Sequence, residues 1–386
     1  MLLFLAVAFL ALLSVDAAPL VASRGGKITP KIFIITMRFK FAPEGEVWYD
    51  IPEFNLLANN ITVPGFSPLF PDAHCTSVGD ICQVNTGTAE INAAATISAL
   101  WLSDKFDLTL TYFFITGIAG VNPNVATISG VSFARYAVQV GLQYEIDPRE
   151  LPANFSSGYF PIGSSSSDSY PVNIYGTEVF ELNDALRKEA IQYAKTATLN
   201  DSDAAVAYRA NYPQDAARSS PSVIGCDVAT ADAWWSGKIL SDAFSNTTRT
   251  WTNGTGIYCA TAQEDNATLE ALVRGASAGK LDFGRVILMR TFSDFDQPYA
   301  AEQALFNLRY ADQGAILPSI SNIYLAGIKV VQGILTSWDF KFKDGIKPTN
   351  YIGDMFGTLG GNIKPDFGPG EAVYSGFRRR NIPVIP

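Results

Sequence analysis

The length, composition and charge of the chain indicate one large globular domain. It has 386 residues, of which 48% are hydrophobic and 17% are charged, and this apolar content is enough to build a sizeable core. The formal net charge of -9 argues against nucleic acid or an anionic membrane as a partner, because both are bound through basic patches.

The first segment, residues 1–17, is typical of a secretory signal peptide. Residues 2–13 are apolar almost without interruption, and small residues such as Ala17 and Ala18 follow them. A buried helix or a membrane anchor is the alternative, but a dozen residues at about 1.5 Å each fall well short of a hydrocarbon core of about 30 Å. We therefore predict export to the outside of the cell or its surface. Later apolar runs, such as 108–121 and 323–334, are predicted to be core elements.

Sequons for N-glycosylation support this prediction. Six N-x-Ser/Thr sequons occur, and they begin at Asn60, Asn154, Asn200, Asn246, Asn253 and Asn266. Any sequon that carries a glycan must be exposed to solvent. Their density indicates a glycoprotein of the secretory pathway.

The cysteine count also fits an oxidising compartment. The four cysteines allow three pairings, and we predict one disulfide between Cys75 and Cys82 across a small loop and another between Cys226 and Cys259 on neighbouring strands. No pattern has the spacing of a zinc site, and we expect His74 to be a loop residue rather than a ligand. A single histidine also argues against hydrolases with a histidine base. We expect neither a metal nor an organic cofactor.

Apolar runs and helical stretches alternate along the chain. The predicted strands are 32–37, 83–85, 108–116, 223–227, 256–260 and 285–290, the clearest helix is 89–102, and the loop-rich segments are 152–176 and 341–370. Such alternation predicts an α/β fold in which a mixed central sheet is flanked by helices on both faces.

A series of short motifs follows the same order as in a known family. They read PKIFIITM, APEGEVW, NTGTAEINAAATISAL, FFITGIAGVNP, SGVSFARY, CDVATADAWWSGK, CATAQEDNATLEAL and ILMRTFSDFDQP. Short glycine-containing turns are common, so the order of the motifs over about 300 residues carries the signal. The chain resembles the nucleoside phosphorylase superfamily and, within it, the fungal purine nucleoside permease family. This resemblance implies a nucleoside phosphorylase-like domain over residues 28–386 and a purine nucleoside as ligand.

Each motif falls where a predicted strand ends. Ligand crevices of open α/β sheets lie beyond the carboxyl ends of strands, and a nucleoside needs an apolar face for its base and hydrogen-bonding groups for the ribose and the purine nitrogens. The residues that we place at this crevice are Glu46, Thr86, Gly87, Thr88, Gly117, Asp232, Trp234, Glu264, Asn266, Ser293 and Asp294.

Two of these residues receive catalytic roles from the resemblance. Asp294 is the predicted general acid that protonates the departing purine, with Ser293 orienting it, although either residue could instead cap a following helix. Glu46 stands where nucleosidases carry the carboxylate that activates water, and its alternative is a solvated glutamate in a first helical turn. The long loop RFKFAPEG leaves the position of this carboxylate open by a residue or two. Phosphorylases hold phosphate in this loop, and Arg38 could serve that purpose.

Two positions depart from the enzymes. Where the enzymes generally present a ribose-binding glutamate, two residues beyond Glu264, this chain has Asn266, whose amide cannot stabilise the cationic sugar of the transition state. Ile118 replaces a common serine. These changes favour binding over catalysis. A glycan on Asn266 would block the pocket, so we predict an empty sequon there. Adjacent tryptophans such as Trp234 and Trp235 are usually core or interface residues. We nevertheless predict that Trp234 faces the base.

Three functions remain open. The first is a secreted or cell-surface protein that binds purine nucleosides and serves their uptake, passing the ligand to a membrane transporter because the chain itself has no spanning segment. The second is an extracellular enzyme that cleaves the N-ribosidic bond with water, through Glu46, or with phosphate bound at the turns of Gly87 and Gly117. The third is a storage protein. Superfamily analogy also implies a homo-oligomer.

Overall fold

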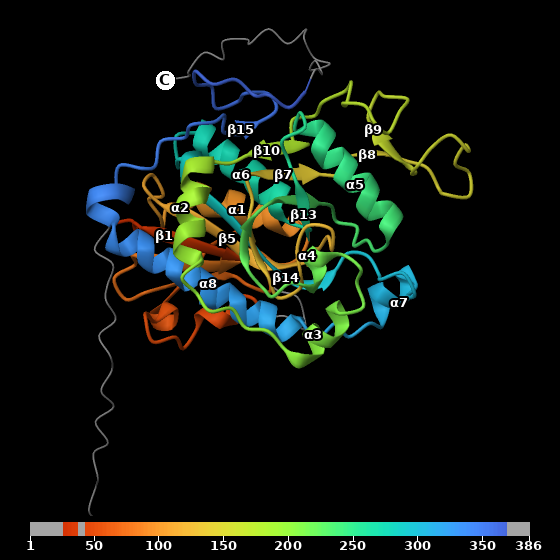
Figure 1. The fold of residues 1–386 in the computed structure, drawn as a ribbon. Helices are drawn as coiled ribbons and strands as arrows, with labels where there is room; N and C mark the ends of the chain where they lie inside the picture. Colours follow the sequence, from red (N-terminus) through yellow and green to blue (C-terminus); the bar gives the residue numbers. More distant parts are fainter. Residues whose placement is uncertain (1–25, 38–42, 369–386) are drawn as a thin grey trace, which may run out of the picture.

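The computed structural model describes residues 26–37 and 43–368 (Figure 1). Three predicted features lie outside these ranges: the signal peptide at 1–17, Arg38, and the end of the predicted domain at 369–386. None of the helices in the described ranges is both long and apolar enough to cross a membrane.

Strands and helices alternate along the described chain. The strands are β1 Ile32–Thr36, β2 Asn59–Thr62, β3 Asp72–Cys75, β4 Ile81–Asn85, β5 Tyr112–Val121, β6 Val131–Phe133, β7 Tyr136–Gln139, β8 Gln143–Glu145, β9 Tyr159–Pro161, β10 Val179–Glu181, β11 Val223–Gly225, β12 Asp227–Thr230, β13 Tyr258–Ala262, β14 Val286–Phe295 and β15 Gly353–Asp354. The α-helices are α1 Glu90–Leu102, α2 Asp184–Ala194, α3 Asp203–Arg209, α4 Asp215–Arg218, α5 Lys238–Trp251, α6 Asp265–Ser277, α7 Ala304–Arg309 and α8 Ile316–Thr336.

One large mixed sheet organises the molecule. Its main path runs β15-β10-β7-β12-β13-β5-β1-β4-β3-β2, while β14 pairs with β5 and β6, and β11 pairs with β6. At the centre, β1 is parallel to both β4 and β5, and β14 is parallel to β5. The outer pairs β2 with β3 and β10 with β15 are antiparallel. The prediction of a mixed central sheet is confirmed.

Helices cover both faces of this sheet, also as predicted. Successive residues of a strand point to opposite faces, and in β1 the side chains of Phe33 and Ile35 join one core while those of Ile32 and Ile34 join the other. The first core includes residues of α1 and α6, and the second includes residues of α2 and α8. Figure 1 shows α2 and α8 on one side of the central strands, with α1 and α6 beyond them.

Several strands differ from the predicted limits: the predicted strand 223–227 is divided between β11 and β12, and β5 and β14 differ most. β5 begins at Tyr112 rather than 108, because the Asp107 carboxylate accepts the Thr109 N–H and holds 107–111 in a turn. It continues through Gly117 and Gly120, where the absent side chains leave room for close neighbours. β14 does not end at 290 but runs to Phe295, because it remains paired with the extended β5.

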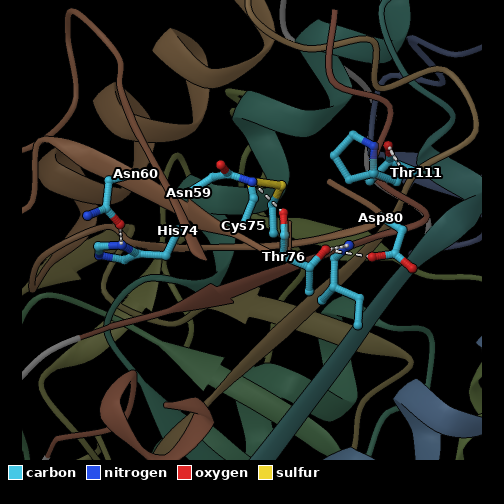
Figure 2. Close-up of a disulfide and its surroundings, with 10 residues drawn as sticks. Asn59, Asn60, His74, Cys75, Thr76, Asp80 and Thr111 are labelled. Atoms are coloured by element: carbon cyan, nitrogen blue, oxygen red, sulfur yellow. Dashed lines mark hydrogen bonds between the residues drawn. A yellow bond between two sulfur atoms is a disulfide. The ribbon is translucent and has the colours of Figure 1, made fainter. Parts of the chain in front are cut away.

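Both predicted disulfides are present. Cys75 is joined to Cys82 between β3 and β4, and Cys226 to Cys259. Figure 2 shows the first of these beside His74, whose Nδ1 lies 2.7 Å from Oδ1 of Asn60. His74 belongs to β3 and not to a loop. In the described parts of the chain, no cluster of three or more His, Cys, Asp or Glu residues could hold a metal ion.

Candidate functional site

A cavity opens at the carboxyl ends of the central strands, where ligand crevices of open α/β sheets lie. The segments after β1, β12 and β13 form its rim, and the second halves of β5 and β14 form its floor. Its lining consists of Met37, Glu44, Thr88, Ile118, Ala119, Gly120, Ala233, Trp234, Trp235, Thr261, Ala262, Gln263, Glu264, Arg290, Ser293 and Asp294.

A bulge in β14 brings two adjacent residues into this cavity. The register with β5 shifts between Phe292 and Asp294, so Ser293 is an extra residue opposite the partner strand. A β-bulge re-aims the side chains that follow it, and Ser293 and Asp294 consequently both line the cavity. The alternative that either residue caps a helix is wrong, because both lie within a strand.

Burial is the main influence on the carboxyl of Asp294. Burial raises the pKa of Asp294, and the hydrogen bond from Ser293 lowers it by less. The Ser293 hydroxyl lies 2.7 Å from Oδ1 of Asp294. Across the strand pair, Gly120 leaves room for the carboxyl, because a Cβ at this glycine would lie 3.3 Å from Oδ2 of Asp294. Burial thus favours the protonated form of Asp294, which can donate a hydrogen bond to a ligand.

Trp234 supplies an aromatic face to the same cavity. Its side chain is 54% exposed and lines the cavity, whereas Trp235 is 7% exposed and its ring packs edge-on against Phe244. The two adjacent tryptophans thus divide between the cavity and the core. We call Ser293, Asp294 and Trp234 the Asp294 wall.

A second group of residues at the cavity surrounds a buried arginine. The guanidinium of Arg290 is bound by both carboxylate oxygens of Asp265, with Nε 3.2 Å from Oδ2. Its Nη2 lies 3.6 Å from Oε2 of Glu264, and its Nη1 donates to the carbonyl of Ile118 at 3.2 Å. Glu44 is the third carboxyl that faces it. We call Arg290, Glu44, Glu264 and Asp265 the Arg290 wall.

Because one cation faces three carboxyls, they do not all ionise readily. Burial raises the pKa of Glu44 to about 8, and the nearby Arg290 charge lowers it by less. Burial likewise raises the pKa of Glu264, again opposed by Arg290. Oε1 of Glu44 accepts the backbone N–H of Ile118 at 3.0 Å. Its Oε2 is buried and has no hydrogen-bond partner among the described residues, so this oxygen is available to a ligand.

Two glycines set the position of Glu44. A Cβ at Gly117 would lie 2.4 Å from Nη1 of Arg290 and 3.3 Å from Oε2 of Glu44, so only glycine lets both side chains approach β5. A Cβ at Gly45 would lie 2.5 Å from Oδ1 of Asn85. Asn85 is held in turn by the hydroxyl of Thr36 at 2.6 Å. The loop that carries Glu44 is therefore seated on buried polar side chains at the ends of β1 and β4.

The structure places Thr88, Trp234, Glu264, Ser293 and Asp294 on the cavity, as expected, and Gly117 directly behind its lining. Glu46 is not among the lining residues. It begins the short 3-10 helix Glu46–Trp48, and Glu44 of the same loop enters the cavity instead, two residues earlier.

Four further predicted positions also lie off this cavity. Thr86 is buried with its hydroxyl on the carbonyl of Gly87, and Gly87 has a φ of 83° in the turn before α1. Oδ1 of Asp232 accepts the backbone N–H of Glu90 at the start of α1 at 2.8 Å. The Asn266 amide is buried in α6, where it donates to the carbonyl of Thr177 at 2.8 Å. Asp232 and Asn266 instead line a separate, neighbouring hollow.

Sequence reasoning missed the roles of Glu44, Asp265 and Arg290. Arg290 was the last residue of a predicted strand and Asp265 the residue after a predicted ligand, so neither was assigned a role. A signal was present: an arginine inside an otherwise apolar strand must be paired if it is buried. Asp265 and Glu264 were nearby candidates.

Fold and site together define a mixed α/β protein with an open cavity at its strand ends, lined by carboxyls and an aromatic face. Comparison with known sequences then assigns the family. Residues 29–347 match the purine nucleoside permease family. The chain belongs to this family.

Individual relatives agree with this assignment. The chain is 46% identical over 345 residues to a purine nucleoside permease of Candida albicans, covering 88% of this chain and 83% of the relative. It is 41% identical over 319 residues to a probable purine nucleoside permease of Schizosaccharomyces pombe, covering 81% and 90%.

Among solved structures, 5'-methylthioadenosine/S-adenosylhomocysteine nucleosidases are similar. That of Neisseria meningitidis has a TM-score of 0.45 and 15% identity, covering 80% of this chain and 99% of its own. That of Helicobacter pylori has a TM-score of 0.46 and 12% identity, covering 79% and 100%.

Proposed function

We propose that this cavity binds a purine nucleoside and that the chain serves nucleoside uptake by capturing the ligand outside the cell. One observation carries the proposal: an aromatic face, a carboxyl with a raised pKa and further carboxyls that can form hydrogen bonds line the same cavity. The name of the family points to the same ligand class.

In this proposal the purine lies against the Asp294 wall. The protonated carboxyl of Asp294 donates to a purine ring nitrogen, and the indole of Trp234 covers the ring. The ribose faces the Arg290 wall, where Oε2 of Glu44 and the carboxyl of Glu264 bond to hydroxyl groups. A neutral Asp294 suits this task because an ionised carboxylate can only accept hydrogen bonds.

Two substitutions of Asp294 test the proposed contact. We expect Asp294→Ala to weaken binding of inosine and adenosine by about tenfold or more. The substitution removes one buried hydrogen bond between neutral groups and leaves its partner atom unpaired. Asp294→Asn should retain much of the affinity, because an amide N–H can replace the carboxyl O–H as donor.

Titration calorimetry on the purified protein measures both effects. Asp215→Ala is the control, since this aspartate pairs with Arg218 on the surface, with its side chain 97% exposed, and does not line the cavity. Equal affinities for the Asp294→Ala variant and the control would overturn the proposed contact. No binding by the unmodified protein would overturn the binding function and leave the storage role.

Cleavage of the N-ribosidic bond by water is the second candidate. It is favoured by the unpartnered Oε2 of Glu44 in the cavity. Ionised Glu44 would take a proton from water, the water oxygen would bond to the anomeric carbon, and the departing purine would receive its proton from Asp294. Because the pKa of Glu44 is raised to about 8, this carboxyl mostly keeps its proton at neutral pH. Any hydrolysis should therefore accelerate as the pH rises toward 8.

The described cavity offers phosphate few free groups to bind. The N-terminus of α1, which follows the Gly87 turn, is already bonded to protein carboxylates, since Ala89 N–H donates to Glu264 at 3.0 Å and Glu90 N–H donates to Asp232. Arg290 is the one cationic residue in the described lining, and Asp265 occupies it.

One assay separates these functions. The protein is incubated with inosine and adenosine, with and without phosphate, and free base is followed by chromatography across the pH range. No base under any condition eliminates both enzymes. Base without phosphate that disappears in Glu44→Gln establishes hydrolysis, whereas strict dependence on phosphate establishes phosphorolysis.

Export, a membrane transporter partner and self-association complete the proposal. The N-terminus of protein collected from the medium of a secreting culture tests cleavage after Ala17. Crosslinking on intact cells tests the transporter, and light scattering measures the mass of the purified protein. Full-length protein retained in the cytosol would overturn capture outside the cell.

A further inference from the structure

Among the described residues, one edge of the large sheet has no further partner strand. β2 ends the strand order there and pairs with β3, in antiparallel register from Asn59 opposite Cys75 to Thr62 opposite Asp72. All four of its residues are exposed or half-buried. An exposed edge presents unpaired backbone groups to other chains, and proteins usually protect such strands with charged residues or proline. β2 has the sequence NNIT and contains neither.

A sequon lies on this strand. Asn60, Ile61 and Thr62 form an acceptor sequence within β2. Oδ1 of Asn60 faces Nδ1 of His74 on β3 at 2.7 Å, while its amide nitrogen points away from His74 (Figure 2). Within the described ranges no residue bonds to this nitrogen, which is the atom that carries an N-linked glycan. A glycosylated amide keeps its oxygen, so the bond from His74 is compatible with the modification.

In four of the other five sequons this nitrogen is bonded to a neighbouring residue. The amide nitrogen of Asn200 donates to Ser321 at 2.7 Å, and that of Asn246 donates to Asp168 at 2.9 Å. The amide nitrogen of Asn253 donates to Asp366 at 2.8 Å, and that of Asn266 donates to the Thr177 carbonyl at 2.8 Å. The side chain of Asn266 is also buried. Asn154 is exposed, but it lies in a loop and not on a strand edge.

We infer that Asn60 carries an N-linked glycan and that this glycan shields the open edge of the sheet. The donor is an oligosaccharide linked to a lipid through pyrophosphate. The amide nitrogen forms a bond to the anomeric carbon and loses one proton, while the bond from that carbon to the pyrophosphate oxygen breaks. The bulky, hydrated glycan then stands beside β2, where it prevents a second chain from adding a strand. This inference requires export but not nucleoside binding.

Glycopeptide mapping tests the modification. The full chain is secreted from a eukaryotic host, its glycans are released by an amidase in heavy-oxygen water, and each labelled aspartate marks an occupied site. We expect the peptide with Asn60 to be labelled in the majority of molecules and the peptide with Asn266 in none. Secreted protein without label at Asn60 would overturn the inference.

Matched substitutions of Thr62 test the protective role. Thr62→Val destroys the sequon but leaves Asn60 and its bond to His74, whereas Thr62→Ser keeps both the sequon and a hydroxyl for Asp72. We expect the Thr62→Val protein to lose one glycan and to self-associate with increasing concentration in analytical ultracentrifugation, while the Thr62→Ser protein stays unchanged.

Two further measurements complete the test. Asn154→Gln changes a sequon away from the edge and should cause no association. Inosine binding should be the same in all three variants, which separates this inference from the nucleoside-binding proposal. If Thr62→Val loses its glycan but does not associate more than Asn154→Gln, the glycan does not protect the edge.

Discussion

The two walls of the cavity raise the pKa of a carboxyl in different ways. On the Asp294 wall, burial acts almost alone, with one hydroxyl as the opposing partner. On the Arg290 wall, burial also raises the pKa values of Glu44 and Glu264, but the charge of Arg290 opposes both shifts. The pKa of the carboxyl on one wall therefore depends mainly on burial, whereas the pKa values on the other wall also depend on a buried arginine.

This difference separates function from stability. Removing Asp294 leaves no charge without a partner, so it should alter the ligand and spare the fold. Removing Arg290 leaves buried carboxyls without their cation, so it should damage the fold first. The following predictions test this contrast, beginning with the largest effect.

Arg290→Met should cost about 3–5 kcal/mol of the free energy of unfolding at neutral pH, because the buried pair with Asp265 loses one partner. The loss should shrink in acid, where the carboxyls accept protons. Urea denaturation at several pH values measures both. Arg274→Met is the control: Arg274 pairs with Glu270 one helical turn away, its side chain is 68% exposed, and it should cost about 0.5 kcal/mol or less. Equal losses would show that the Arg290 wall is not a stability element.

Glu44→Gln should change how stability depends on pH. The folded pKa of about 8 exceeds the usual 4.5, so the folded state binds a proton that the unfolded state has released between these values. Stability is fully present below 4.5 and falls by about 1.4 kcal/mol per pH unit as the pH rises toward 8. The glutamine variant should lack this slope.

Glu46→Gln is the matched control on the same loop, and it should keep the slope of the unmodified protein. Thermal or urea unfolding across the pH range measures all three proteins. A slope that disappears with Glu46→Gln and persists with Glu44→Gln would return the cavity carboxyl to the position expected from sequence.

The substitution Ala89→Gly tests backbone strain at the point where the Arg290 wall is bonded to the start of α1. Ala89 has a φ of 76° and a ψ of 164°, a backbone region that essentially only glycine adopts without strain of about 1–3 kcal/mol. Its N–H donates to Glu264, which holds it there. We expect the glycine variant to gain about 1 kcal/mol of stability in urea denaturation. Ala94→Gly within α1 should lose about as much, and a loss in both would contradict the strain.

Several features of the fold followed from local pattern. The apolar run of β1 and the helical spacing of α1 predicted those elements within one or two residues, and the alternation of strands and helices predicted the layers. The disulfides also followed, because cysteine number and compartment leave few choices. The limits of β5 and β14 did not follow from local pattern. A glycine usually indicates the end of a strand, but here glycines are tolerated within the strand because neighbouring side chains need the space.

The sequence by itself determined the family, the α/β layers and the segments that surround the cavity, because these depend on composition, periodicity and motif order along the chain. Only the tertiary structure decided which atoms of those segments share the cavity. A bulge turned Ser293 and Asp294 inward, a short 3-10 helix put Glu44 rather than Glu46 inside, and Asn266 bonded to Thr177 instead. Each choice depends on partners far away in the sequence, and local pattern does not contain them.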